Sequence, residues 1–175
     1  MQHLWAFWRS SYIEKVDNIK EKGCFLCEAV NQPPEKHREY LVLHRGKTAF
    51  VIMNLFPYNG GHLMVCPIRH TDDFTSLSGE ELLEINLLVQ ACIKALKRAI
   101  NPHGFNIGWN LGRVAGAGLE EHIHCHVVPR WNGDTNFMPV LSETKVISQH
   151  FLSLYDRIKP LLEEEVQKIF RKVNS

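Results

Sequence analysis

The sequence predicts an α+β domain: a mostly antiparallel five-stranded sheet with one central helix and a C-terminal helix. Three observations predict it, namely five short β-type segments separated by turns, a long helical pattern in the middle of the chain, and a second one at its end. With 175 residues the chain is long enough to bury a core without disulfides. We expect a single domain over 1–175, with a core at 24–146, an N-terminal segment at 1–23 and a C-terminal helical segment at 147–175.

The expected strands are rich in β-branched, aromatic and leucine residues and are bounded by turn residues such as Gly, Pro and Asn. They lie at 40–43, 48–55, 62–68, 105–111 and 122–131. Because short turns join several of them, antiparallel pairing is favoured.

The central helix is predicted at 78–100. Ser78, followed three residues later by Glu81, forms a capping box, and apolar residues then recur at helical spacing. The pattern is helical again at 148–173, where Pro160 is expected to kink or split the helix.

The composition is that of a globular protein, with 45% apolar residues and a formal net charge of +1. Such a balance gives no general attraction to polyanions, so nucleic acid is not an expected partner and phosphate must be recognised locally. No apolar run reaches the roughly 18 residues of a membrane span, and the N-terminus lacks a signal-peptide layout. Five cysteines, unevenly spaced, make a poor disulfide framework. We expect a cytoplasmic protein with no membrane partner.

The most informative segment carries a histidine at every second position. On a β-strand, His122, His124 and His126 should line one face in steps of about 6.6 Å, with Ile123 and Cys125 facing a core. A lone histidine is usually a structural residue, but three on one face have no packing explanation. The remaining interpretations are a metal site and a catalytic row. The catalytic row is favoured, because the steps are too long for all three rings to reach one ion at about 2.1 Å.

Imidazole suits attack on phosphorus, because its unperturbed pKa of about 6.5 leaves part of it neutral at cellular pH. The nucleophile also needs a partner for its opposite ring nitrogen and donors for the charged oxygens of the transferred group. The glycine-rich stretch 112–118, just upstream, can bring backbone N–H groups close to such oxygens. A glycine loop alone is weak evidence, but beside a histidine row it favours a phosphate site.

The His-x-His-x-His pattern followed by two apolar residues resembles the signature of the histidine-triad (HIT) superfamily. Asn54 with the run 61–67, and Asn110 with the following glycine loop, resemble the first strand pair and the phosphate loop of that superfamily. The segments 4–9 and 131–137 are similar to a prokaryotic branch described as diadenosine-tetraphosphate phosphorylase-like, or fragile-histidine-triad-like.

The resemblance implies a role for each matching residue. His124 would be the nucleophile that forms a nucleotidyl-histidine intermediate, with its opposite ring nitrogen held by the backbone carbonyl of His122. His126 would contact the phosphate or the leaving group, and His62 would help to organise the row. The nucleotide-binding residues would be Asn54, Asn110, Gly116, Ala117 and Gly118. Family members are commonly homodimers that extend one sheet across both subunits.

Cys24 and Cys27 form a Cys-x-x-Cys pair, which is compatible with a redox pair, half of a metal site or two buried thiols. The redox interpretation is disfavoured because no thioredoxin-like βαβ pattern surrounds the pair. The resemblance supplies two further ligands, because His70 and His122 match positions that bind zinc in some superfamily members. Since zinc takes four thiolate and imidazole ligands in a closed tetrahedron, we expect these four residues to hold a structural Zn²⁺, with inert thiols as the alternative.

The predicted function is cleavage of dinucleoside polyphosphates, such as diadenosine tetraphosphate, or of related nucleotide anhydrides. After attack by His124, water would release the nucleotidyl group in a hydrolase and inorganic phosphate would release it in a phosphorylase. The triad is compatible with both, because both attack the same intermediate. The rival interpretation is a nucleotide-binding regulatory protein with incidental slow turnover, which needs the pocket but not the nucleophile.

Overall fold

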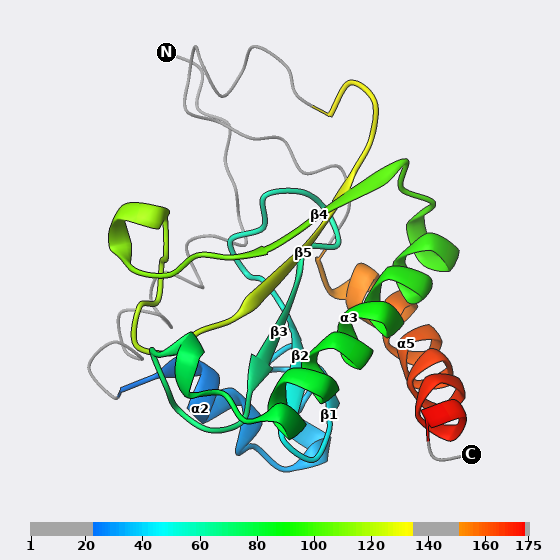
Figure 1. The fold of residues 1–175 in the computed structure, drawn as a ribbon. Coiled ribbons are helices and arrows are strands. Elements are labelled where there is room, and N and C mark those ends of the chain that lie inside the picture. The colour runs from blue at the N-terminus through cyan, green and yellow to red at the C-terminus, as the bar shows by residue number, and fades with distance from the viewer. Residues whose placement is uncertain (1–22, 135–150, 174–175) are drawn as a thin grey trace.

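The computed structural model describes residues 23–134 and 151–173, so the segment 1–22 and the stretch 135–150 lie outside the described residues. Five strands form one antiparallel sheet in the order β1-β2-β3-β5-β4 (Figure 1). These strands are β1 (Val42–Arg45), β2 (Ala49–Met53), β3 (Leu63–Pro67), β4 (Gly104–Trp109) and β5 (Cys125–Arg130). The predicted α+β class and the five-stranded antiparallel sheet are confirmed.

Two long helices pack side by side against this sheet. Helix α3 (Gly79–Ile100) lies across β2, β3 and β5, and α5 (Phe151–Val173) lies against α3 and β1 (Figure 1). Helix α3 starts as predicted, because the Ser78 side chain accepts from the Glu81 N–H and the Glu81 carboxylate accepts from the Ser78 N–H. A short helix, α2 (Phe25–Val30), contacts β1. Three single 3-10 turns are η1 (Pro34–Lys36), η2 (Phe74–Ser76) and η3 (Arg113–Ala115).

The hydrophobic core lies between the helices and the sheet. Polar side chains lie near the ends of β3 and β5. Strands β2 and β3 are buried along their whole length, as are Cys125 and Val127 of β5. Along α3, apolar side chains such as Leu88 and Leu96 are fully buried at helical spacing. Because side chains alternate along a strand, His126, which lies between Cys125 and Val127, points to the other face of the sheet.

The start of the first strand and the course of the last helix differ from the sequence prediction. The sequence predicts the first strand at 40–43, but β1 begins at Val42, because Leu41 has a φ of 63°, a left-handed value foreign to an extended strand.

Pro160 is predicted to kink or split the last helix, yet α5 continues through it as one helix. Pro160 and Asp156, whose carbonyl loses its usual partner, are both exposed, while the buried side of α5 continues from Ile158 to Leu162.

Of the helices in the described part of the chain, none combines the length and the apolar character that a membrane-spanning segment needs.

Candidate active site and metal centre

The histidine row stands at the start of β5 but is divided between two sites. The strand begins at Cys125, so His122 and His124 precede it and His126 lies on it. The ring centroids of His124 and His126 are 4.7 Å apart. The ring of His122 instead faces the cysteine pair. The predicted strand at 122–131 therefore starts three residues later than expected, and the contact of the His122 ring with the cysteine pair is the one that the predicted zinc set requires.

His124 has one ring nitrogen held and one available. Its Nδ1 lies 2.9 Å from the carbonyl oxygen of His122, which can only accept, so Nδ1 carries the ring proton and Nε2 keeps its lone pair. Burial lowers the pKa of the His124 imidazole, although the hydrogen bond to His122 acts in the opposite direction. His124 is therefore neutral at physiological pH, which is the form that a nitrogen nucleophile requires.

His126 forms a hydrogen-bonded pair with His62, the residue before β3. The His62 Nε2 lies 3.0 Å from the His126 Nδ1, and the backbone N–H of Tyr58 donates to the His62 Nδ1 at 3.1 Å. Because a backbone N–H only donates, His62 carries its proton on Nε2 and donates it to His126, which leaves the His126 proton on Nε2. Burial, and secondarily the neighbouring His124, lowers the pKa of His126 to about 4, so its ring is neutral and presents an N–H.

Both asparagines that the sequence singles out lie beside this pair. The Asn54 amide nitrogen is 3.2 Å from the His62 Nδ1, and its side-chain oxygen accepts from the Phe56 N–H. The Asn110 amide nitrogen is 3.3 Å from the His126 Nε2. The structure thus brings the two asparagines to the His62–His126 pair from different segments, one before β3 and one after β4.

The glycine-rich loop lies next to Asn110, whose amide nitrogen is 3.4 Å from the Gly116 carbonyl oxygen. Positive φ angles at Gly112 and Gly116 turn the chain on either side of η3. The N–H of Gly116 bonds to Arg113 and the N–H of Ala117 bonds to Gly112. These two predicted phosphate donors are therefore engaged within the loop in this structure.

Open space beside His126 comes from a glycine on the neighbouring strand. Gly108 of β4 is directly opposite His126 of β5, and paired residues share a face of the sheet. A Cβ at Gly108 would meet no other atom within 4 Å. This position therefore leaves room for a ligand next to the histidine pair.

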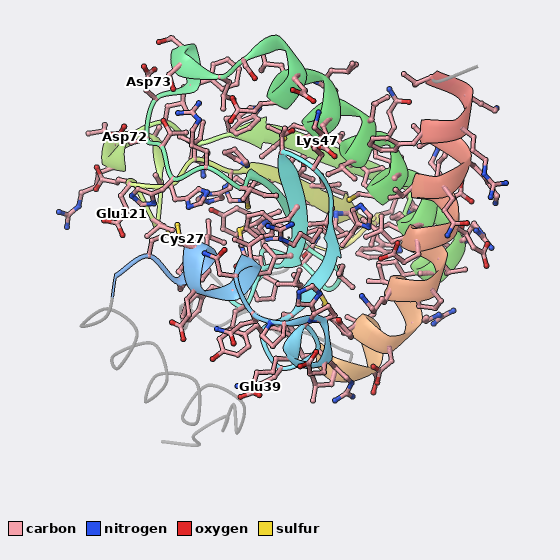
Figure 2. All side chains as sticks on the ribbon, turned by 90° about the horizontal axis from the view of Figure 1, so that it is seen from below. Cys27, Glu39, Lys47, Asp72, Asp73 and Glu121 are labelled. Carbon is pink, nitrogen blue, oxygen red and sulfur yellow. The ribbon has the colours of Figure 1, made fainter. Side chains whose placement is uncertain are left out.

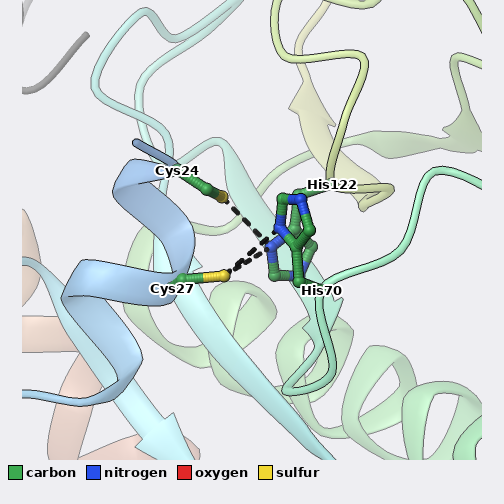
Figure 3. Close-up of side chains that lie close together, drawn as sticks. All are labelled: Cys24, Cys27, His70 and His122. Carbon is green, nitrogen blue, oxygen red and sulfur yellow. Dashed lines mark hydrogen bonds between the residues drawn. The ribbon is translucent and has the colours of Figure 1, made fainter. Parts of the chain in front are cut away.

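Cys24, Cys27, His70 and His122 meet in a compact cluster (Figure 3). Their ligand atoms all lie within 4.8 Å of one another. The His122 Nδ1 is 3.2 Å from the Cys24 Sγ and 3.4 Å from the Cys27 Sγ, and the His70 Nδ1 is 3.3 Å from the Cys27 Sγ. The predicted four residues are therefore brought together, Cys24 as the cap of α2 and Cys27 one helical turn later.

The cluster fits a zinc ion in both geometry and protonation. In a tetrahedral site, sulfur and nitrogen ligands are about 3.6 Å apart, close to the contacts above. The His122 Nε2 donates to the Pro67 carbonyl at 2.9 Å, which places the ring proton on Nε2 and directs the Nδ1 lone pair at the thiols. Burial lowers the pKa of His122 to about 4, so the ring is neutral and able to bind a cation.

Charges around the cluster also favour a cation. Burial, and then Cys24 and Glu121, raise the pKa of Cys27 to about 11, so its thiolate form is costly without a neighbouring positive charge. Figure 2 shows Asp72, Asp73 and Glu121 along the same edge of the molecule as Cys27. A divalent cation would stabilise both thiolates and offset this negative surface.

The sequence predicts no individual role for three residues near the site. Tyr58 supplies the N–H that fixes His62, and its ring stacks on the His62 ring at 4.9 Å. Asn59 and Asp134 are hydrogen-bonded to each other behind this turn at 2.6 Å. A backbone N–H carries no sequence signal, whereas Asp134 lies inside the recognised segment 131–137 and was detectable as part of that motif.

The fold and the site together define a protein that presents a neutral imidazole with an unprotonated ring nitrogen beside a second neutral imidazole with a ring N–H, at the end of an antiparallel sheet. The chain belongs to the HIT domain family, whose model matches residues 35–133. This confirms the superfamily that the sequence resembles.

Known proteins of the same kind support that assignment. The chain is 40% identical over 152 residues to a protein of Mycobacterium tuberculosis named AP-4-A phosphorylase, covering 85% of this chain and 78% of that protein. It is 27% identical over 139 residues to bis(5'-adenosyl)-triphosphatase of Dictyostelium discoideum, covering 76% and 93%. A structure described as a Zn-bound histidine triad family protein from Mycobacterium smegmatis has the same fold, with a TM-score of 0.64, 23% identity and coverage of 84% and 98%.

Proposed function

We propose that this protein is an enzyme that cleaves dinucleoside polyphosphates, or related nucleotide anhydrides, through a nucleotidyl-histidine intermediate on His124. The observation that carries the proposal is the pair of fixed tautomers: the His124 Nε2 has a lone pair, and the His126 Nε2 beside it has a proton. One ring can attack while the other donates a hydrogen bond. The names of the two relatives describe cleavage of the same class of molecule.

The first step forms a bond between the His124 Nε2 and a phosphorus atom and breaks the bond from that phosphorus to the bridging oxygen. The leaving polyphosphate departs with the electron pair, and the N–H of His126 stabilises its oxygen. The carbonyl of His122 meanwhile steadies the positive charge that develops on the His124 ring. In the second step, an oxygen of water or phosphate bonds to the same phosphorus, the bond from phosphorus to the His124 Nε2 breaks, and its electron pair returns to the ring. When water attacks, its proton is released to solvent.

The nucleotide would lie across the open face next to Gly108. Asn54 is proposed to hold the ribose hydroxyls, while Asn110 and the loop at Gly116, Ala117 and Gly118 hold phosphate oxygens. The loop's bonds at Gly116 and Ala117 would open when a phosphate takes over those N–H groups. His62 is proposed to orient His126 rather than to touch the reacting phosphorus.

A structural zinc at Cys24, Cys27, His70 and His122 is part of the proposal. Four protein ligands close the coordination shell, so the ion would supply stability rather than Lewis acidity. The described structure gives the four donors a fitting geometry and gives His122 the matching tautomer.

We also propose a homodimer and a cytoplasmic location. Strand β4 is an edge of the described sheet and exposes Ile107 by 47%, which supports pairing of this edge with a second copy. None of the five cysteines is in a disulfide, which is the usual state in a reducing compartment and supports the cytoplasmic location.

Release of the nucleotidyl group by phosphate, rather than by water, is favoured by the name of the relative that is 40% identical. The deciding experiment incubates the protein with diadenosine tetraphosphate in labelled water, with and without inorganic phosphate, and identifies the products by mass spectrometry. A nucleoside diphosphate that increases with phosphate identifies a phosphorylase. Label found only in the monophosphate identifies a hydrolase, and no cleavage under either condition supports a regulatory nucleotide-binding protein instead.

Trapping the intermediate tests the covalent step directly. A rapid acid-free quench followed by peptide mapping should find one nucleotidyl group on the peptide that contains His124. The control is His44→Ala, which changes a histidine bonded to Glu163 away from the row and should leave the adduct intact. An adduct on any other residue would contradict the proposal.

A further inference from the structure

His62 and His126 are hydrogen-bonded to each other, and a further donor faces the outer ring nitrogen of each. These two donors favour opposite positions for the ring protons of the pair. At one end the Tyr58 N–H, helped by the Asn54 amide, points at the His62 Nδ1. At the other end the Asn110 amide nitrogen lies 3.3 Å from the His126 Nε2. If Tyr58 prevails, the His126 proton is on Nε2. If Asn110 prevails, both imidazole protons move to the Nδ1 atoms and the His126 Nε2 loses its hydrogen.

Geometry favours the Tyr58 end in the described structure. Its contact with His62 is 3.1 Å and comes from a backbone N–H, which cannot reverse. The Asn110 contacts are longer, at 3.3 Å and 3.4 Å, and an amide side chain can turn over to present its oxygen. The direction of the chain therefore depends on how firmly the turn holding Tyr58 stays in place.

Asn59, the next residue in that turn, ties it to the strand that carries His126. The Asn59 amide nitrogen donates to the Pro129 carbonyl at 3.0 Å and to the Asp134 carboxylate at 2.6 Å. The Asn59 backbone carbonyl accepts a hydrogen bond from the His62 N–H, so Asn59 also contacts His62 directly. Asn59 is 6% exposed, which shields these bonds from water.

Asp134 is held in place by several hydrogen bonds from residues on and beside β5. Its carboxylate accepts two hydrogen bonds from Arg130 and one from the Trp131 N–H, at 2.7 Å, 2.8 Å and 3.1 Å. These bonds, those to Arg130 first, hold the pKa of Asp134 well below its ordinary value, so the carboxylate is charged at any physiological pH. Since Arg130 lies on β5 four residues after His126, the anchor is built on the catalytic strand itself.

We propose that Asn59, held by Asp134, is a positioning residue that fixes the proton arrangement of the His62–His126 pair, so that His126 meets the leaving group as an uncharged N–H donor. The proposal rests on the proposed function and adds a preference among leaving groups. An uncharged N–H stabilises a leaving group that departs as an anion, such as a polyphosphate. It does not supply a proton to a leaving nitrogen, which must gain one as its bond to phosphorus breaks.

The test compares diadenosine tetraphosphate with adenosine 5′-phosphoramidate, which releases ammonia. The measured quantity is kcat/KM, because it covers only the steps up to the first irreversible one and excludes the common second step. In Asn59→Ala the ratio of the two values, tetraphosphate over phosphoramidate, should fall by about tenfold or more, since the donor to the anionic leaving group is lost. Asp134→Ala should shift the ratio in the same direction, and Asp134→Asn, which keeps an oxygen for Asn59, should shift it less.

A spectroscopic measurement gives a second, independent result. Nitrogen-15 shifts of labelled imidazoles should place the His126 proton on Nε2 in the wild type and move it towards Nδ1 in Asn59→Ala. This wild-type measurement decides the proposal even if the Asn59 variant does not fold. A wild-type His126 that is charged, or protonated on Nδ1, at neutral pH overturns it.

The control for general loosening is Leu162→Ala, a buried residue of α5 outside the site, which should lower stability without changing the substrate ratio. If Asn59→Ala lowers both kcat/KM values by the same factor, Asn59 has only a structural role and the proposal fails. If the wild type cleaves neither substrate, the proposed function itself fails, which is a distinguishable outcome.

Discussion

The carbonyl oxygen of His122 accepts the Nδ1 hydrogen of His124 at 2.9 Å, while the side chain of the same His122 belongs to the cysteine–histidine cluster. One residue thus serves the proposed nucleophile through its backbone and the proposed metal through its ring. The two groups leave the chain in different directions, so neither role excludes the other. Any change that releases the His122 ring should therefore disturb the orientation of His124.

Replacing the nucleophile should separate chemistry from binding. His124→Ala removes the attacking nitrogen, so turnover of diadenosine tetraphosphate should be abolished while nucleotide affinity stays within about tenfold, or ~1.4 kcal/mol. Rates and dissociation constants measured on the same preparation check this. Substantial residual activity in the variant would rule out the covalent mechanism.

Metal analysis should find about one zinc per chain in protein purified without chelator. The paired variant Cys24→Ser, Cys27→Ser should lose that zinc and unfold at a lower temperature, because two of its four ligands are gone. Cys92→Ala, which changes a buried thiol in α3, is the control and should keep the zinc. Zinc-free wild-type protein with unchanged stability would identify the four residues as ordinary packing.

Filling the space beside His126 should block the substrate without harming the fold. Gly108→Val adds a β-branched side chain to β4 where a Cβ meets no other atom within 4 Å, so the thermal midpoint should stay the same or rise. We expect kcat/KM for diadenosine tetraphosphate to fall by about tenfold or more, because the added methyl groups occupy the ligand's place. Unchanged kinetics would show that the substrate does not pass this position.

Acid should weaken the turn between β1 and β2 through Glu84 of α3. This buried carboxylate accepts the backbone N–H groups of Lys47, Thr48 and Ala49. Burial raises its pKa, but these bonds together with the Thr48 hydroxyl outweigh burial and leave the pKa lowered.

A lowered folded-state pKa means that the stabilisation from Glu84 is present above the unfolded-state value of about 4.3 and is lost as the pH falls through the folded value. Glu84→Gln should therefore destabilise the protein by about 1–3 kcal/mol at neutral pH and by less in acid. Denaturant unfolding at several pH values measures this, with the exposed Glu80→Gln as the control. A constant difference across the pH range would contradict the assignment.

The sequence was sufficient to predict the class of fold and to select the histidines and cysteines that lie together in the structure, because residue type and spacing can be read directly from it. It did not reveal that β5 begins only at Cys125, so that His122 and His124 precede the strand and His126 alone of the three lies on it. The positive φ of Leu41 was not predictable either, because a leucine by itself disfavours the left-handed region.

One backbone group and one long-range link between side chains account for the rest of what the sequence did not predict. The positions of the ring protons in the His62–His126 pair depend on the backbone N–H of Tyr58. Every residue except proline has such a group, so the sequence gives no sign of it. The link from Asn59 to Asp134 joins residues 75 positions apart, so no local pattern announces it.

The sheet order also determines when the chain acquires its chemistry. His62 and His126 are 64 positions apart in the sequence, and Cys24 and His122 are 98 apart, yet each pair is in contact. The last strand of the described chain, β5, lies between β3 and β4 in the sheet. Closing such long loops costs chain entropy before any stabilising contact can form. We therefore expect the histidine pair and the cysteine–histidine cluster to form only when β5 joins the sheet. During synthesis on the ribosome, a chain that has not yet released β5 would lack both the proposed nucleophile and the complete proposed metal site, so we expect it to be inert toward nucleotides until its sheet is complete.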